Sequence, residues 1–274
     1  MSNDIEISDE ELKALTSAIK KRYDIDFTNY EVKSLKRGFK RLIIKHKLGS
    51  ILGLWTKVLR DQEYFKSCID DLTVNLTELF RNPEIWKKMH DDVLLQYQDN
   101  QQIKVWHAGC STGEEVYTMA IVMNDKKLLK KTQVLATDLS SRALASAIEG
   151  EYSDILVKRY ADSFAKYLDG SDINTCFEES EKGWRVKDML RKHIEFKQHN
   201  LVQDGMNKKF DMIFCRNVMI YFDENLKNKV LKLFHEALAP GGYLIIGYYD
   251  MITEESKKIF ELYDSTTRIY KKVD

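Results

Sequence analysis

The chain has 274 residues, of which 43% are hydrophobic and 31% are charged, a globular composition that excludes wholesale disorder. Lys plus Arg and Asp plus Glu both total 43, so the formal net charge is zero. This balance excludes a polycation that coats nucleic acid or a membrane, and any electrostatic recognition must come from a local patch.

The front of the chain, residues 1 to about 95, carries only helix signals. Its acidic start, MSNDIEISDEE, lacks the apolar core of a secretory signal. Three patterns are typical of helix N-termini: Ser8 with Glu11, Thr28 with Glu31, and Asn82 followed by Pro83. The last predicts a helix from Pro83 to about Leu95, and residues 99–102 are predicted to be a linker.

From residue 103 the pattern alternates between short strands and helices. Runs of β-branched and aromatic residues predict strands at 103–108, 132–138, 210–215 and 243–249. Helices are predicted at 115–123, 139–150 and 224–238, the last capped by Asp223, and residues 239–242 are predicted to be a turn. This alternation predicts an α/β fold with a doubly wound, mostly parallel sheet. The ligand of such a sheet lies beyond the carboxyl ends of its strands.

Residues 174–198 depart from this alternation. The runs NTCFEES, GWRVKD and HIEFKQ surround a turn near Lys182-Gly183 and predict a small antiparallel β insertion. The predicted organisation is an N-terminal helical domain, residues 1–75, and an α/β domain, residues 76–274, with a β subdomain at about 174–198.

The first candidate site is the turn AGCSTGEE after the first strand of the α/β domain. Gly109 and Gly113 allow a ligand to approach the backbone closely, and the following helix offers free N–H groups. A phosphate-binding loop needs a lysine and a hydroxyl where this chain has Glu114 and Glu115. Two acids suit a ligand with cationic, hydroxyl and amine groups, such as S-adenosylmethionine. A glycine turn with two solvated acids is the alternative.

Asp138 ends the next strand, TQVLATD. A carboxylate at this position, about 20 residues beyond a glycine turn, can accept hydrogen bonds from both ribose hydroxyls. Its alternative role is a cap for the helix that begins near Ser140. Together with the glycine turn, Asp138 favours a ligand that contains a nucleoside.

A third candidate run, CRNVMIYF, follows a buried strand at the predicted ligand edge of the sheet. It contains Arg216, Asn217 and Tyr221. The alternative is a core segment, residues 218–222, with Tyr221 at its boundary.

A fourth run, VNLTELFR, joins the helical front to the α/β domain. Its polar residues are Asn75, Thr77 and Arg81, and the last two share a face if the stretch is helical. The alternative for Arg81 is an exposed charge at a helix end.

The runs NLTELFR, CSTGEEVY, ATDLS, HNL and FCRNVMIYF, in this order and spacing, resemble the chemotaxis receptor glutamate O-methyltransferases, the CheR family. The resemblance covers the chain from about Ile19 to Tyr270. It implies a class I S-adenosylmethionine methyltransferase-like fold with a helical N-terminal domain and a small β insertion. It also implies a cytoplasmic enzyme that methylates glutamate side chains of chemoreceptors and leaves S-adenosylhomocysteine as product.

The resemblance implies roles for matching positions. Arg81 and Tyr221 would be catalytic and line the methyl-transfer site. The residues implied to bind the cofactor are Asn75, Thr77, Arg81, Gly109, Glu115, Asp138, Asn200, Leu201, Arg216 and Asn217. Of these, Asn75, Thr77 and Arg81 would help to bind the methionine end and shape the acceptor site. Glu115 would lie near the amino group, and Asp138 would hold the ribose. The residues that would flank the adenine are Asn200, Leu201, Arg216 and Asn217.

The implied chemistry needs few protein groups. A glutamate carboxylate, with an unperturbed pKa of about 4.3, is ionised at neutral pH and needs no general base. Charge is cancelled as carboxylate meets sulfonium, so a dry site favours the transition state. We therefore expect no metal, no covalent enzyme intermediate, and packing roles for Cys110 and Cys215.

Two positions depart from the family pattern. Where the family often has Gly-His-Ser-Glu after the last core strand, this chain has Gly247-Tyr248-Tyr249-Asp250, at the expected rim of the acceptor site. His107 stands where a small residue is usual, and we expect it to be a packing residue rather than a base.

The predicted second helix is strongly basic. Its cations are Lys33, Lys36, Arg37, Lys40, Arg41, Lys45 and Lys47, with no acid between them, and all but Arg41 and Lys45 are predicted to share one face. This face would steer the enzyme toward acidic chemoreceptor domains. It suits RNA phosphates equally well.

Two other functions remain open beside the glutamate methyltransferase. One is an S-adenosylmethionine-dependent methyltransferase of RNA or a small molecule, and the other is a non-catalytic cofactor-binding signalling protein. The run at 215–222 favours the glutamate enzyme over the first, and Arg81 with Tyr221 favours it over the second. The expected partners are therefore chemoreceptor cytoplasmic domains, with no nucleic acid and no membrane insertion.

Overall fold

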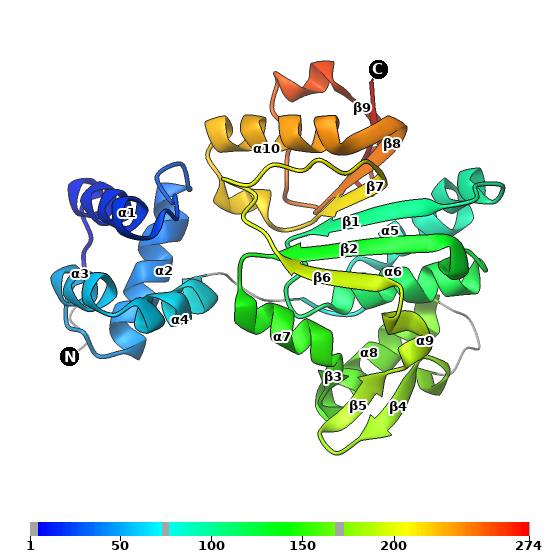
Figure 1. Ribbon diagram of the computed structural model, residues 1–274, viewed down its shortest axis with the longest axis horizontal. Helices are drawn as coiled ribbons and strands as arrows, with labels where there is room; N and C mark the ends of the chain where they lie inside the picture. Colours follow the sequence, from blue (N-terminus) through cyan, green and yellow to red (C-terminus); the bar gives the residue numbers. More distant parts are fainter. Residues whose placement is uncertain (1–4, 73–76, 168–172, 274) are drawn as a thin grey trace.

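The computed structural model describes residues 5–72, 77–167 and 173–273, and its helical front stands at one side of the α/β domain (Figure 1). The front contains α1 (Asp9–Tyr23), α2 (Val32–Lys45), α3 (Ile51–Arg60) and α4 (Gln62–Leu72). Their apolar faces meet in one cluster, where Leu15, Ile19, Phe39, Ile43 and Leu54 are almost fully buried. Each such side chain contributes about 1.5–3 kcal/mol on burial, so the front has a core of its own.

No described helix is both long and apolar enough to cross a bilayer.

The helix starts confirm one predicted cap of the front and correct another. Ser8 and Glu11 form the predicted capping box, in which each backbone N–H donates to the other side chain. The pairing of Thr28 with Glu31 was wrong, because α2 begins at Val32 and Glu31 itself is the cap. The longer Glu31 side chain reaches forward and accepts hydrogen bonds from the backbone N–H groups of Lys33 and Ser34, at 3.0 and 2.6 Å.

The basic face of α2 also differs from the prediction. The helix ends at Lys45, so Lys47 lies beyond it, with a left-handed φ of 53°. Lys36 forms an ion pair with Asp9 at 2.6 Å, and Lys45 forms one with Asp71 at 2.7 Å. Part of the positive charge is therefore used inside the helical front.

The α/β domain is built on a seven-stranded sheet with the order β6-β2-β1-β7-β8-β10-β9. The strands are β1 (Ile103–Ala108), β2 (Thr132–Asp138), β6 (Ile194–Gln198), β7 (Phe210–Cys215), β8 (Leu238–Ile246), β9 (Phe260–Asp264) and β10 (Ile269–Lys272). Five neighbouring strands, β6, β2, β1, β7 and β8, run parallel, whereas β10 is antiparallel to β8 and to β9. The strand order switches direction between β1 and β7, and ligand sites of such sheets lie at this switch point.

Helices cover both faces of the sheet, as the doubly wound prediction requires (Figure 1). The core on one face includes α5 (Pro83–Asp91), α6 (Glu114–Asp125) and α8 (Asp154–Tyr167), and the core on the other includes α10 (Glu224–Ala237). The remaining helices are α7 (Ser141–Glu149), α9 (Asp188–Arg191) and short 3-10 turns at Val93–Tyr97, Leu129–Lys131, Ile173–Thr175, Met219–Tyr221 and Ser256–Lys258.

Two boundaries of helices and strands differ from the prediction. The helix from Pro83 ends at Asp91 rather than near Leu95, because the chain tightens into a 3-10 turn there. The predicted turn at residues 239–242 is part of β8, which begins at Leu238. Its pairing with β7 shifts register here, and Gly241 has a left-handed φ of 69°, so the glycine-rich run forms an irregular strand.

The small antiparallel sheet exists, but its strands differ from the prediction. It has the order β3-β5-β4, with β3 (Glu151–Tyr152), β4 (Phe177–Ser180) and β5 (Gly183–Val186). The run HIEFKQ instead forms β6, which pairs in parallel with β2 at the edge of the main sheet. The predicted subdomain at 174–198 was therefore wrong at its end, because a short apolar run alone does not reveal the direction of its partner.

Candidate functional site

The turn between β1 and α6 brings backbone to the carboxyl edge of the sheet. Gly109 has a φ of 89°, and a Cβ there would lie 2.4 Å from Cγ2 of Val218. Gly113, with a φ of 94°, is the N-cap of α6, and Ser111 is also left-handed, with a φ of 50°. These glycines are needed because the backbone conformation and the close packing both exclude a side chain.

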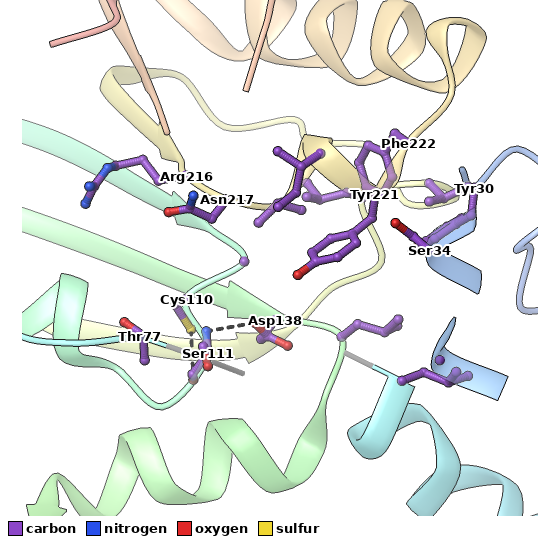
Figure 2. Close-up of a pocket in the computed structure, with 18 of the residues that line it drawn as sticks. Tyr30, Ser34, Thr77, Cys110, Ser111, Asp138, Arg216, Asn217, Tyr221 and Phe222 are labelled. Atoms are coloured by element: carbon purple, nitrogen blue, oxygen red, sulfur yellow. Dashed lines mark hydrogen bonds between the residues drawn. The ribbon is translucent and has the colours of Figure 1, made fainter. Parts of the chain in front are cut away.

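Asp138 holds this turn in place (Figure 2). Its Oδ2 accepts a hydrogen bond from the Ser111 N–H at 2.8 Å, and its Oδ1 accepts one from the Ser140 N–H at 2.9 Å. Burial raises the pKa of Asp138, although these backbone donors act in the opposite direction. Ser140 caps α7 with its own side chain, so the alternative role of Asp138 as the side-chain cap of this helix is wrong.

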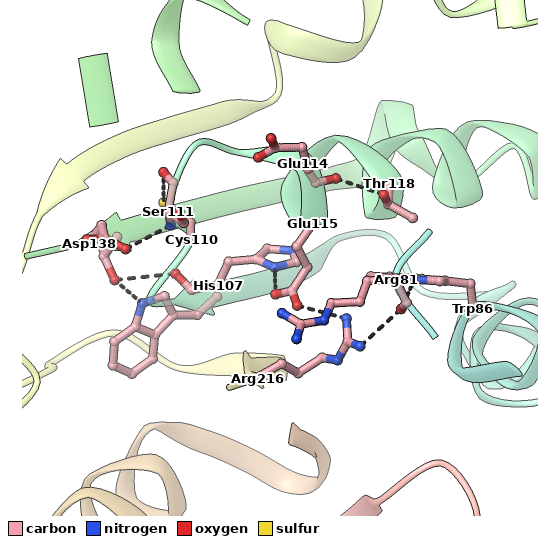
Figure 3. A network of polar contacts seen from close by, with 12 residues as sticks. Arg81, Trp86, His107, Cys110, Ser111, Glu114, Glu115, Thr118, Asp138 and Arg216 are labelled. Atoms are coloured by element: carbon pink, nitrogen blue, oxygen red, sulfur yellow. Dashed lines mark hydrogen bonds and ion pairs between the residues drawn. The ribbon is translucent and has the colours of Figure 1, made fainter. Parts of the chain in front are cut away.

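Glu115 lies at the centre of a buried polar network (Figure 3). Its Oε1 contacts Nδ1 of His107 at 2.9 Å, and its Oε2 accepts a hydrogen bond from Nη1 of Arg216 at 3.0 Å. Burial opposes ionisation of Glu115, but His107 and Arg216 outweigh it and hold its pKa below the usual range. His107 is fully buried and stacks on Phe214, so its predicted packing role is confirmed, and it also orients Glu115.

Arg216 also fastens the run at 77–82 to the sheet. Its Nη2 donates to the carbonyl of Arg81 at 3.0 Å and to Oδ1 of Asn82 at 2.8 Å. Asn82 occupies the N-cap position of α5 without a side-chain hydrogen bond to that helix, because its amide binds Arg216 instead. Residues 77–82 are not helical, with left-handed φ at Phe80 and Asn82, so the conditional helical face of Thr77 and Arg81 does not exist.

The segment after β7 carries Tyr221 in a short 3-10 turn. Its conformation is set by Asp250, a fully buried carboxylate that accepts hydrogen bonds from the backbone N–H groups of Asn217 and Ile220 at 2.5 and 3.0 Å. The carbonyl of Tyr221 accepts a hydrogen bond from the Glu31 N–H at 2.8 Å. The helical front and the α/β domain therefore meet at this residue.

Asn200 and Leu201 lie in the turn after β6. The Asn200 backbone N–H donates to Asp204 at 2.8 Å, and its side chain binds Gln203 and the Val202 N–H. These contacts fix the conformation of the turn. Leu201, the next residue in it, is nearly buried.

A cavity of about 440 Å³ joins these features. Among the predicted site residues in the described part of the chain, the cavity is lined by Thr77, Arg81, Gly109, Glu115, Asp138, Asn200, Leu201, Arg216, Asn217 and Tyr221. Asn75 lies outside the described residues. The volume is within the range of about 300–1,000 Å³ that is typical of small-molecule sites.

Several lining residues were not predicted from the sequence. Helix α2 contributes Ser34, Arg37 and Arg41, and the turn after β8 contributes Tyr249. The sequence placed the Gly-Tyr-Tyr-Asp run at the expected rim of the acceptor site without singling out Tyr249, and it assigned the basic helix to partner recognition rather than to the cavity. Cys110 and Cys215 are buried, and burial raises the pKa of both thiols, in keeping with packing roles.

Comparison with known proteins identifies the chain's family. Residues 75–269 match the family model described as CheR methyltransferase, SAM binding domain, and residues 10–73 match CheR methyltransferase, all-alpha domain. A protein of Borreliella burgdorferi named chemotaxis protein methyltransferase is 31% identical over 273 residues, covering 90% of each chain. One of that name from Listeria monocytogenes is 30% identical over 239 residues, 86% of this chain and 88% of its own. The Pseudomonas putida protein named Cher3 is 32% identical over 240 residues, 88% of each chain.

The cavity fits the cofactor that this family binds. The carboxylates of Glu115 and Asp138 suit the ammonium and the ribose hydroxyls of S-adenosylmethionine. Two buried polar atoms of lining residues, Ser111 Oγ and His199 Nδ1, have no hydrogen-bond partner among the described residues. Unpaired buried polar atoms at a cavity wall indicate a polar ligand. The chain therefore belongs to the CheR family of chemotaxis methyltransferases, with an all-helical N-terminal part and a domain that binds S-adenosylmethionine and transfers its methyl group.

Proposed function

We propose that this methyltransferase forms methyl esters on glutamate side chains of chemoreceptor cytoplasmic domains. The observation that carries this proposal is the cationic surrounding of Tyr221. Arg37, Arg41 and Arg81 line the same cavity as Tyr221. Burial raises the pKa of the Tyr221 hydroxyl, while these three charges act in the opposite direction. Three guanidinium groups thus act on one end of the cavity, and a carboxylate acceptor there is electrostatically favoured.

The opposite sign of charge lies toward the strand ends. Asp138 at the end of β2 and Glu115 at the start of α6 are acidic. In this proposal Asp138 accepts hydrogen bonds from the ribose hydroxyls, and Glu115 receives the amino group. Asn75, Thr77 and Arg81 help to bind the methionine end and shape the acceptor site. The residues that flank the adenine are Asn200, Leu201, Arg216 and Asn217.

Bound S-adenosylmethionine supplies a methyl group activated on a sulfonium. The chain's own residues then need only bind, align and exclude water. Arg81 orients the acceptor carboxylate, and the protonated hydroxyl of Tyr221 donates a hydrogen bond that fixes the geometry at the transferring group. No proton has to be removed from the acceptor, so alignment supplies much of the rate.

The partner follows from the charge of α2. Arg37 and Arg41 line the cavity, and Lys33 and Lys40 belong to the same helix. An acidic receptor segment would be drawn to this helix as its glutamate enters the cavity.

The proposal is tested by incubating the protein with methyl-labelled S-adenosylmethionine and the cytoplasmic fragment of a methyl-accepting chemoreceptor from the same genome. We expect label on the receptor that mild base releases as methanol, because carboxyl methyl esters hydrolyse readily. Total cellular RNA in a parallel reaction provides the control. Label on RNA, or no transfer by a protein that binds S-adenosylhomocysteine, would contradict the proposal.

A further inference from the structure

The turn Gly247-Tyr248-Tyr249-Asp250 is fixed onto the segment that carries Tyr221. Its first and last residues close it through a hydrogen bond from the Asp250 N–H to the Gly247 carbonyl at 3.0 Å. The Asp250 carboxylate then binds the backbone N–H groups of Gly247, Asn217 and Ile220. A Cβ on Gly247 would lie 2.6 Å from that carboxylate. The turn therefore has little freedom to move relative to the cavity.

The two corner residues of this turn are large, aromatic and exposed. Tyr248 is 54% exposed and Tyr249 is 75% exposed, and Met251 just beyond is 63% exposed. Corner positions of turns normally carry small or polar residues. Together these three residues form a surface that we name the aromatic rim. Tyr and Met are enriched where protein surfaces bind partners. The rings of Tyr248 and Tyr249 pack edge to face with their centroids 5.3 Å apart, so they form a contiguous patch rather than scattered apolar residues.

The aromatic rim borders the cavity. Tyr249 lines the same cavity as Tyr221 and Arg81, and Arg37 and Arg41 of α2 line it as well. A side chain that reaches Tyr221 keeps its own backbone at the cavity mouth, so its neighbours in the acceptor protein must contact the residues that surround the mouth. Those residues combine positive charge with exposed apolar surface.

We infer that the aromatic rim is the docking surface for the acceptor protein. The partner it fits is an acidic segment that presents an apolar side chain beside the accepting carboxylate. Its acidic groups match α2, and its apolar side chain covers the rings of Tyr248 and Tyr249. This inference rests on the proposed function, since it concerns the recognition of the same acceptor.

The test measures binding of the S-adenosylhomocysteine-loaded protein to the chemoreceptor cytoplasmic fragment by biolayer interferometry, beside KM and kcat for transfer. In the double variant Tyr248→Ser with Tyr249→Ser, we expect the Kd and the KM for the fragment to rise about tenfold, with the change in KM larger than that in kcat. The affinity for S-adenosylhomocysteine is measured by calorimetry on Tyr248→Ser alone, whose side chain is outside the cavity lining, and should stay within about twofold. Tyr248→Phe with Tyr249→Phe keeps the apolar surface and should restore fragment binding.

Leu262→Ser is the matched control, because Leu262 is also apolar, 48% exposed, and lies on β9 outside the cavity lining. Equal fragment affinity of wild type and the Ser–Ser variant, or a wild type that does not bind the fragment, overturns the inference. Binding that depends on the aromatic rim without any methyl transfer sustains the inference and contradicts the proposed glutamate chemistry. Methyl transfer to the fragment with an unchanged KM in the Ser–Ser variant sustains the proposed glutamate chemistry and contradicts the inference about the aromatic rim.

Discussion

Tyr221 keeps its hydroxyl proton at neutral pH, because burial raises its pKa from a value that is already high. The hydroxyl therefore acts as a hydrogen-bond donor and not as a base. For Tyr221→Phe we expect kcat to fall about 10- to 100-fold, the effect of losing about 1.4–2.8 kcal/mol of transition-state stabilisation. The calorimetric Kd for S-adenosylhomocysteine should change by less than about threefold.

The control for this variant is Tyr263→Phe, which removes a hydroxyl that donates to Asp92 at 2.9 Å, outside the cavity lining. Turnover should be retained in that protein. Unchanged turnover in Tyr221→Phe would remove Tyr221 from the mechanism, and an equal loss of product affinity would make it a cofactor ligand only.

Asp250 makes a second prediction at the scale of one residue. Burial raises its pKa from 3.8 to about 6. Between about pH 4 and pH 6 the unfolded chain loses this proton while the folded chain keeps it, so the group's contribution to the free energy of unfolding falls as pH rises. The full fall is about 3 kcal/mol, from about 1.4 kcal/mol per pKa unit.

Asp250→Asn cannot ionise and should lack this slope. Urea unfolding at several pH values between 4 and 7 should show the stability advantage of wild type over the variant shrinking as pH rises. Many other carboxylates titrate in the same range, so only the difference between the two proteins isolates Asp250. A constant difference would show that the pKa of this group is not raised.

At the scale of an element, α2 has two tasks that its sequence alone does not separate. Leu35, Phe39 and Leu42 pack into the helical front, while the opposite side carries cations. For Lys33→Glu with Lys40→Glu we expect KM for the receptor fragment to rise about fivefold at 50 mM salt. The difference should vanish toward 1 M salt, where the Debye length is about 3 Å.

A charge-matched control is Lys158→Glu with Lys232→Glu, since these exposed lysines lie on α8 and α10. If both double variants raise KM equally, net charge rather than the position of α2 governs the encounter.

The small sheet shows at the same scale what local pattern reveals. The runs of β4 and β5 alternate around a turn and were predicted, whereas β3 has two residues and no pattern of its own. The residues of β6 form a short apolar run, and its parallel pairing with β2 depends on a crossover that only the tertiary fold defines.

At the scale of the whole molecule, the sequence could predict those residues of the candidate site that lie in motifs at strand ends. Asp138 and Arg216 follow directly from the alternation of strands and helices, because parallel strands end at one edge. Tyr249 follows β8, which ends at the same edge, but the strand was predicted to run through residue 249, so the turn that carries this side chain was not identified. Arg41 could not be found this way, since it comes from the helical front and reaches the cavity through packing between parts of the chain that carry no shared sequence signal.

This packing predicts that the cofactor stabilises the helical front as well as the sheet. Backbone hydrogen bonds join the two parts, from Glu31 to Tyr221 at 2.8 Å and from Asp223 to Asn29 at 2.9 Å. The cavity lies at the same junction, lined by Tyr30 and Leu35 on one side and Asp138 on the other. A ligand that binds only the folded state adds about 2.7 kcal/mol to the free energy of unfolding when its concentration is 100 times its Kd. The free energy of local opening should rise by the same amount for every element whose opening also opens the cavity.

Hydrogen exchange with and without S-adenosylhomocysteine measures this directly. We expect slower exchange of the amides of α2 from Leu35 to Phe39, together with those at the ends of β1 and β2, because opening of either side releases the ligand. Strands β4 and β5 contribute no residue to the cavity lining and serve as the internal control, with exchange that should change less. Protection limited to the sheet edge would mean that α2 opens while the ligand stays bound, so that the helical front is a docking module and not a wall of the cofactor site.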